Sequence, residues 1–239
     1  MSQGIDMERL LNGVYAGETR AIARMMSLAE GAPTPVHDAM ADIYRHAGRA
    51  HVVGITGVPG SGKSTLVGAL TRLFRKSGRK VGIVAVDPTS PFSGGAILGD
   101  RIRMTDLATD EGVFIRSLAT RGNLGGLASA SLDTVDILDA AGFDLVLIET
   151  VGVCLDEVDI ASAVQTVIVV SAPGLGDDVQ SIKAGVLEIA DTHVVSKADR
   201  PDAARTASDI KAMLGWGLSG RDRGIWSVPV ICTSTETGE

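Results

Sequence analysis

The segment GVPGSGKS at residues 57–64 matches the pattern of a phosphate-binding P-loop. It follows an apolar run at 52–56 and opens a helical pattern at Lys63, which is the order of strand, loop and helix that a P-loop requires. Consecutive N–H groups of such a loop curl around an anion, and the helix N-terminus adds partial positive charge. We expect Lys63 to reach the β- and γ-phosphates of a nucleotide and the Ser64 hydroxyl to ligate Mg²⁺. The predicted phosphate contacts are Gly57, Pro59, Gly60, Ser61, Gly62, Lys63, Ser64 and Thr65.

Three acidic residues follow apolar or glycine-rich stretches where they can meet this loop. Asp87 ends the run at 81–86, Asp100 follows the stretch GGAILG, and Glu149 ends the run at 145–148. Because hard divalent cations prefer oxygen ligands, we expect these carboxylates to hold Mg²⁺ directly or through water, and Glu149 to orient the attacking water. Gly152 is placed to donate its N–H to the γ-phosphate. The alternative is that the two aspartates cap loops and that Glu149 is a solvated strand-end acid.

The segment SKAD at residues 196–199 follows another apolar run and is a candidate for base recognition. Asp199 can accept two hydrogen bonds from the N1–H and exocyclic amine of guanine, and adenine offers neither in that geometry, so the pattern predicts GTP. Lys197 would pack its stem over the base, with Ser196 beside it. Ser234 and Thr235, after the last apolar run, are expected to offer a backbone N–H. The alternative is an ordinary polar loop.

The elements that position these residues alternate between strand and helix. Short runs rich in Val and Ile lie at 52–56, 81–86, 113–116, 145–149, 166–171, 194–196 and 228–232, and helical patterns lie at 63–77, 124–140, 177–190 and 202–214. Such alternation predicts βαβ units and a mostly parallel sheet, whose ligands bind at the carboxyl ends of the strands. We therefore expect one α/β domain at 51–239, preceded by a helical arm at 1–50.

Composition narrows the class of protein further. Charged residues make up 21% and apolar residues 45% of the chain, which is typical of a globular protein. A net charge of −7 with no basic run gives no sign of nucleic acid or a membrane surface as partner. The N-terminus lacks the apolar core of a signal peptide, and no apolar run approaches about 18 residues. The two cysteines, Cys154 and Cys232, fit a reducing cytosol and are expected to be buried. His193 is expected to be a packed core or edge histidine, and the four histidines have no convincing metal-ligand spacing.

The chain resembles the MeaB/ArgK-type GTPases, the bacterial relatives of the human methylmalonic aciduria type A protein. The resemblance spans about residues 8–239 and is carried by GITGVPGSGKSTL, VDPTSPFSGGAILGDRIRM, FIRSLATRGNLGGL, FDLVLIETVGV, EVDIA and APGLGDDVQSIKAGVLEIAD. It implies a Rossmann-like sheet of the SIMIBI class of P-loop GTPases. It also implies a cytoplasmic chaperone that gates and protects an adenosylcobalamin-dependent acyl-CoA mutase of the methylmalonyl-CoA mutase type.

The same resemblance implies roles for particular residues. Lys63 and Ser64 would serve the phosphates and Mg²⁺, the three acids would surround Mg²⁺ and water, and Lys197 and Asp199 would read guanine. The segments 88–104, 149–157 and 174–183 are similar to switch I, switch II and an extra switch that signals to the mutase. Adenosylcobalamin would belong to the mutase, and a homodimer is a possible assembly.

Three departures from the family pattern affect this expectation. Cys154 and Leu155 stand where the family has Gly and Gln, which puts the rate of hydrolysis in question. Ser196 stands in place of Asn and is expected to lose the bracing hydrogen bonds of the amide. The sequence ends at Glu239, where the family continues into C-terminal dimerisation helices. Two alternatives remain open at this point: a nucleotide-binding interaction module with weak or no hydrolysis, and a metallochaperone GTPase for nickel enzymes.

Overall fold

A computed structural model describes residues 6–31, 35–87, 106–119, 129–150, 156–174, 184–217 and 226–238. Its centre is a seven-stranded sheet in the order β3-β2-β4-β1-β5-β6-β7, and every neighbouring pair is parallel. The strands are β1 (His51–Thr56), β2 (Val81–Asp87), β3 (Val113–Ala119), β4 (Leu145–Thr150), β5 (Thr166–Ser171), β6 (Thr192–Val195) and β7 (Val230–Cys232). The sequence prediction of an α/β fold with a mostly parallel sheet is confirmed.

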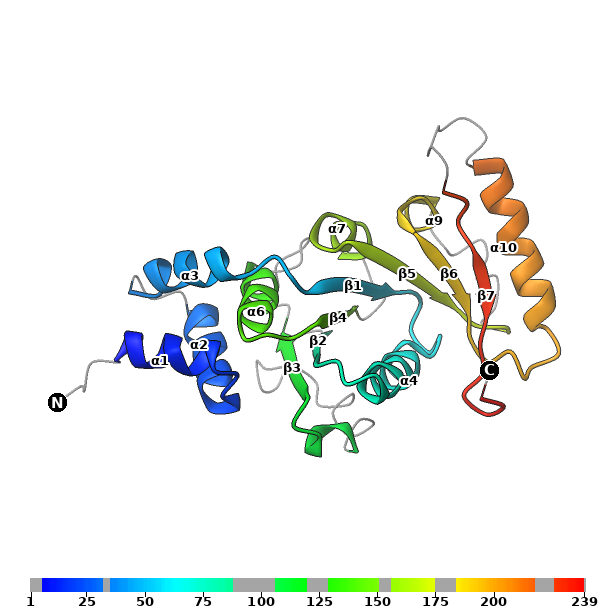
Figure 1. The fold of residues 1–239 in the computed structure, drawn as a ribbon. Helices are drawn as coiled ribbons and strands as arrows, with labels where there is room; N and C mark the ends of the chain where they lie inside the picture. Colours follow the sequence, from blue (N-terminus) through cyan, green and yellow to red (C-terminus); the bar gives the residue numbers. More distant parts are fainter. Residues whose placement is uncertain are drawn as a thin grey trace, which may run out of the picture.

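Helices cover both faces of the sheet (Figure 1). Figure 1 shows α4 (Lys63–Lys76) on one side of β1 and α7 (Asp156–Ala163) on the other. The α4 face is filled by alternate strand residues such as Val53 and Ile55, together with Leu107 of the 3-10 turn η1 (Leu107–Thr109). The opposite face carries α6 (Ser129–Ala140), α7 and α9 (Ala184–Ile189). Strands buried on both faces explain why the apolar runs are nearly continuous.

One glycine in β1 allows α7 to lie unusually close to the sheet. A Cβ on Gly54 would lie 2.6 Å from Cδ1 of Ile160, which is a fully buried side chain of α7. Because Gly54 has no Cβ, there is space in which the side chain of Ile160 packs. This contact holds α7 against β1.

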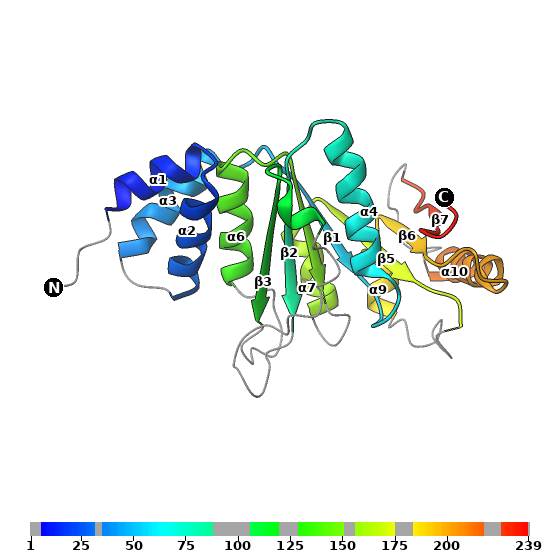
Figure 2. The ribbon, with the colours of Figure 1, turned by 90° about the horizontal axis from the view of Figure 1, so that it is seen from below.

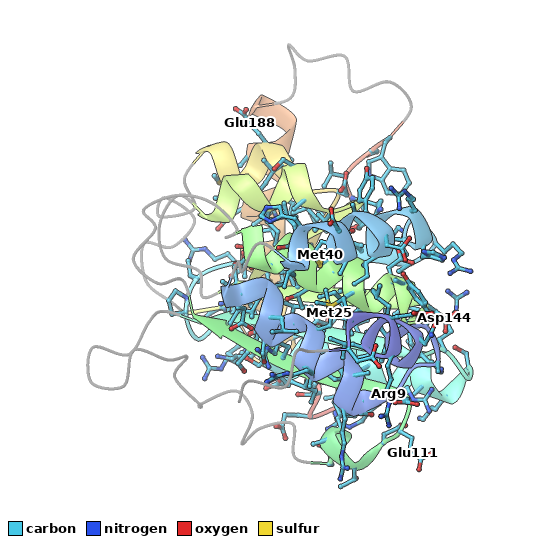
Figure 3. The ribbon with its side chains drawn as sticks, turned by 90° about the vertical axis from the view of Figure 1, so that its left-hand side faces the viewer. Arg9, Met25, Met40, Glu111, Asp144 and Glu188 are labelled. Atoms are coloured by element: carbon cyan, nitrogen blue, oxygen red, sulfur yellow. The ribbon has the colours of Figure 1, made fainter. Side chains whose placement is uncertain are left out.

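The N-terminal arm packs against α6 at one end of the sheet (Figures 1 and 2). It consists of α1 (Met7–Tyr15), α2 (Thr19–Gly31) and α3 (Pro35–His46), and its buried side chains belong to the same apolar cluster as α6. Figure 3 shows the arm from outside, with Met25 among its helices. Arg116 of β3 forms an ion pair with Glu30 of α2 and so ties the arm to the edge strand.

At the other end of the molecule, α10 (Ala203–Gly217) packs on β6 and β7 (Figure 2). Cys232 is exposed there, so the expectation that it is buried was wrong. The physical reason is that β7 is an edge strand with a neighbour on one side. His193 is fully buried on β6, as expected, and Cys154 lies outside the described residues. No helix in the described ranges is long and apolar enough to cross a membrane.

Candidate functional site

The P-loop follows β1, and its shape depends on positions that only glycine can occupy. Gly57 has a φ of 139°, and a Cβ there would lie 2.1 Å from the carbonyl oxygen of Val170 in the neighbouring β5. Gly62 caps α4 in the left-handed region with a φ of 91°. The Nζ atom of Lys63 donates to the carbonyl oxygens of Gly57 at 2.8 Å and Val58 at 3.1 Å. Lys63 thus spans the loop from the first turn of α4 and is buried at 6% exposure.

Two side chains that carry oxygen atoms meet beside the start of α4. The Ser64 hydroxyl donates to Oε1 of Glu149 at 2.6 Å, and Glu149 is 5% exposed at the end of β4. Ser64 lies in the first turn of α4, and Glu149 lies on β4, which pairs with β1, the strand that leads into the P-loop; Ile55 of β1 is paired to Glu149. A hydroxyl and a carboxylate in one buried place are the donor types that Mg²⁺ prefers. The residues present therefore fit a magnesium ion, with Ser64 and Glu149 as candidate ligands.

The other predicted acids are placed only in part. Asp87 is the last residue of β2, and β2 pairs with β4 up to Val86 opposite Thr150, so its main chain lies at the same edge as Glu149. The structure does not describe the Asp87 side chain. Asp100 and Gly152 lie outside the described residues. Their roles remain predictions.

The loop after β6 contacts the P-loop at two points. The Ser196 hydroxyl donates to the carbonyl oxygen of Ser61 at 2.5 Å, and Nζ of Lys197 donates to the carbonyl oxygen of Gly60 at 2.8 Å. Lys197 adopts a φ of 55°, which is unusual for a residue with a side chain. Ser196 thus keeps one hydrogen bond to the P-loop through its shorter side chain, and the expected loss relative to an amide stays a prediction.

The predicted base-reading residues come together at the carboxyl ends of β6 and β7. The Ser234 hydroxyl donates to Oδ1 of Asp199 at 2.6 Å, and the backbone N–H of Ala198 donates to the carbonyl of Thr233. The hydrogen bond from Ser234 is the main cause that lowers the pKa of the Asp199 carboxyl from its usual value. Asp199 is therefore an exposed, ionised acceptor. Thr235 is exposed beside this pair.

Two interactions at the site were not predicted from the sequence. The Thr150 hydroxyl donates to that of Thr56 at 2.9 Å, which joins the end of β4 to the residue before the P-loop. Arg200 donates from Nη1 to the carbonyl oxygen of Pro173, at 3.3 Å, and so links the loop after β6 to the loop after β5. The strand register places Thr56 beside Thr150, but the sequence alone does not give that register.

Comparison with known proteins gives consistent similarities. Residues 22–239 match the family model described as "Methylmalonyl Co-A mutase-associated GTPase MeaB". A Pyrococcus horikoshii protein named as a GTPase is 49% identical over 233 residues, covering 98% of this chain and 74% of that protein. The mouse protein named "Methylmalonic aciduria type A homolog, mitochondrial" is 32% identical, and the match covers 98% of this chain and 60% of the mouse protein. The crystal structure of an LAO/AO transport system kinase superimposes with a TM-score of 0.78 at 27% identity, covering 99% of this chain and 72% of that one.

Proposed function

Because this chain belongs to the MeaB family of methylmalonyl-CoA mutase-associated GTPases, we propose that it binds and hydrolyses GTP as the chaperone of an adenosylcobalamin-dependent acyl-CoA mutase. The observation that carries the proposal is the meeting of Lys63, Ser64 and Glu149 at one edge of a parallel sheet. Lys63 and Ser64 open α4 within the P-loop, and Glu149 is the second-last residue of β4, which neighbours β1. The proposal assigns the residues after 51 to nucleotide chemistry and the arm at 1–50 to packing.

Phosphate binding is assigned to the loop between β1 and α4. Its N–H groups and the N-terminus of α4 favour an anion, because the first N–H groups of a helix have no partner within it. The ammonium of Lys63 lies on carbonyls of the same loop, within reach of an anion that this loop encloses. We assign to Lys63 the compensation of charge on the β- and γ-phosphates of the nucleotide.

Magnesium would be held by Ser64 and by the carboxylates at the ends of β2 and β4, with Asp100 as a further candidate. Bound there, Mg²⁺ would neutralise charge on the phosphates. Glu149 keeps Ser64 oriented through its 2.6 Å hydrogen bond. We propose that Glu149 also accepts a hydrogen bond from the water that attacks the γ-phosphate, which makes it the residue that holds the nucleophile in line. The N–H of Gly152 is proposed to contact the γ-phosphate.

Base selection is assigned to Asp199. Its carboxylate is exposed and ionised, and Ser234 occupies Oδ1. A carboxylate oxygen has two acceptor positions, so both oxygens can still accept a hydrogen bond from a base. The N1–H and amine of guanine match this acceptor set, and adenine presents an acceptor at N1. The stem of Lys197 is proposed to cover the base and Thr235 to offer its backbone N–H.

The link to a mutase is proposed from the family and from the segment 174–183. The family description names methylmalonyl-CoA mutase, and the mouse relative is named for methylmalonic aciduria. Residues 175–183 lie outside the described part, and they begin just after Pro173, which Arg200 contacts. We propose that Gln180 and Lys183 transmit the state of the nucleotide to the mutase. A homodimer is part of this proposal; neither nucleic acid nor a membrane is a proposed partner.

The proposal is tested by single-turnover hydrolysis of GTP with the wild type and two matched variants. Glu149→Gln keeps the shape of the side chain and removes its charge, so we expect hydrolysis to fall by at least about tenfold. Glu111→Gln is the control, because Glu111 is exposed at the opposite end of the strands, before β3. Binding without hydrolysis in the wild type would favour the interaction module suggested by Leu155.

The chaperone role needs a second measurement, with the acyl-CoA mutase of the same organism added at saturation. We expect the mutase to raise the rate of GTP turnover, and Gln180→Ala and Lys183→Ala to reduce that rise while leaving the basal rate nearly unchanged. A physical link between two sites requires contacts that differ between nucleotide states. No rise with any adenosylcobalamin-dependent mutase would defeat the chaperone proposal and leave the GTPase proposal standing. As to a metallochaperone, no described group of three or more His, Cys, Asp or Glu side chains is arranged to hold a metal ion.

A further inference from the structure

Ser196 follows β6 and lies against the P-loop, which follows β1, although the strand β5 stands between β1 and β6 in the sheet. Its hydroxyl donates to the carbonyl oxygen of Ser61, and it is 8% exposed. A Cβ on Gly62 would lie 3.3 Å from Oγ of Ser196 and 3.5 Å from its Cβ. The side chain thus bonds to Ser61 and lies beside Gly62, although it belongs to the motif predicted to read the base.

The chemistry of a hydroxyl limits what Ser196 can do beyond this contact. A serine has one proton to donate, and here that proton is given to Ser61. The N7 and O6 edge of guanine presents acceptors only, so it is recognised by donors. Ser196 has no proton left for that edge unless it gives up the P-loop. An asparagine would carry two donor hydrogens and would not face this choice.

We propose that Ser196 is a positioning residue of the phosphate-binding loop and takes no part in reading the base, which is left to Asp199. The proposal rests on the function proposed above, namely that the chain binds guanine nucleotides. In a trans peptide the C=O and N–H point in opposite directions. The hydroxyl that holds the Ser61 carbonyl therefore directs the N–H of Gly62 away from Ser196. That N–H stands at the N-terminus of α4, where backbone donors favour phosphate.

The first experiment compares a ligand with a base and a ligand without one. Binding of GTP, ITP and inorganic tripolyphosphate is measured in the presence of Mg²⁺ for the wild type, Ser196→Ala and Asp199→Asn. We expect Ser196→Ala to weaken GTP and tripolyphosphate by the same factor, about threefold to tenfold for one hydrogen bond, and to leave the ratio of ITP to GTP affinity unchanged. Asp199→Asn is the matched control, because it should change that ratio and leave tripolyphosphate unaffected.

The second experiment uses 7-deaza-GTP, which lacks the N7 acceptor. The wild type should bind it within about twofold of GTP, because Ser196 offers no donor to N7. Ser196→Asn, with its extra donor, should keep or strengthen tripolyphosphate binding, which identifies the P-loop contact as the function of this position. A wild type that binds 7-deaza-GTP at least about tenfold more weakly than GTP would overturn the proposal.

Other results would also overturn the proposal. A loss of GTP affinity in Ser196→Ala with unchanged tripolyphosphate affinity would show that the hydroxyl contacts the nucleoside. A changed ratio of ITP to GTP would show the same. Thermal unfolding of each variant identifies misfolded protein, and affinities are compared per folded molecule. A wild type that binds no guanine nucleotide defeats the proposed function itself, and this is distinct from every outcome above.

Discussion

We predict that Gly112→Ala lowers the stability of the wild type but raises the stability of a variant that lacks the side chain of Arg75. Gly112 follows the turn before β3, and a Cβ there would lie 2.1 Å from Cζ of Arg75. Arg75 donates to both oxygens of Asp110 at 2.9 Å and to the carbonyl of Arg79 at 2.7 Å. Gly112→Ala must therefore displace the guanidinium and break this set of bonds. The backbone of Gly112 itself lies outside the left-handed region, so alanine is not strained there.

The magnitude follows from two opposing effects. The side chains of Arg75 and Asp110 are 23% and 34% exposed, so screening by solvent limits their paired contribution to about 1.5 kcal/mol. Replacing glycine by alanine restricts the unfolded chain and contributes about 0.5 kcal/mol in favour of folding. Gly112→Ala should thus lower the free energy of unfolding by about 1 kcal/mol, which is a fall in Tm of about 3 °C for a chain of this size.

The same substitution in an Arg75→Ala background has no guanidinium to displace. It should then raise the free energy of unfolding by about 0.5 kcal/mol, so its sign reverses. Urea unfolding of the wild type, the two single variants and the double variant gives the complete cycle. If Gly112→Ala lowers stability equally in both backgrounds, the crowding of Arg75 is not its cause and the reasoning fails.

Three further predictions concern charge. Lys63→Ala should weaken GTP binding by about 2–5 kcal/mol, because it removes the buried cation of the loop; an unchanged affinity in a titration would remove the P-loop argument. Asp199→Asn turns one acceptor into a donor, so xanthosine triphosphate, with an oxygen at C2, should compete better against GTP; retention of the wild-type preference would exclude Asp199 as the base reader. Burial, followed by the charges of Asp133 and Asp139, raises the pKa of Asp136 to about 6. Protonated Asp136 therefore contributes stability that is fully present below the pKa of this carboxyl in the unfolded chain and is lost as pH rises through about 6. Asp136→Asn should therefore raise the free energy of unfolding near pH 8 by about 1 kcal/mol after allowance for solvent screening, and the gain should disappear towards pH 4. A gain that is equal at both pH values would contradict the assignment.

The sheet was predictable because its inner strands are buried on both faces. Continuous runs of Val and Ile separated by helical patterns identify such strands without any knowledge of their neighbours. The helix α7 was not predicted, since it has eight residues and one large buried side chain among those described, Ile160. What holds Ile160 is the space above Gly54, which is more than a hundred positions earlier in the chain. The local sequence pattern of α7 gives no information about the contact between Ile160 and Gly54.

The site residues were located by motif, but their mutual contacts were not. Ser196 and Ser61 are 135 positions apart, and only the fold reveals that one donates to the other. Cys232 shows the same limit for burial. Its run of apolar residues has the pattern of an interior strand, and the order of strands, which places β7 at the edge, is not encoded within the run.

The P-loop is held from both sides of β1. On one side Glu149 of β4 accepts from Ser64, and on the other side Ser196 and Lys197, after β6, donate to the carbonyls of Ser61 and Gly60. Removing any of these contacts should therefore lower nucleotide affinity, whether or not the residue touches the nucleotide. A loss of GTP binding alone does not identify a ligand contact in such a loop. The ligand without a base separates the two cases, because it senses the shape of the loop and is indifferent to the groups that read guanine.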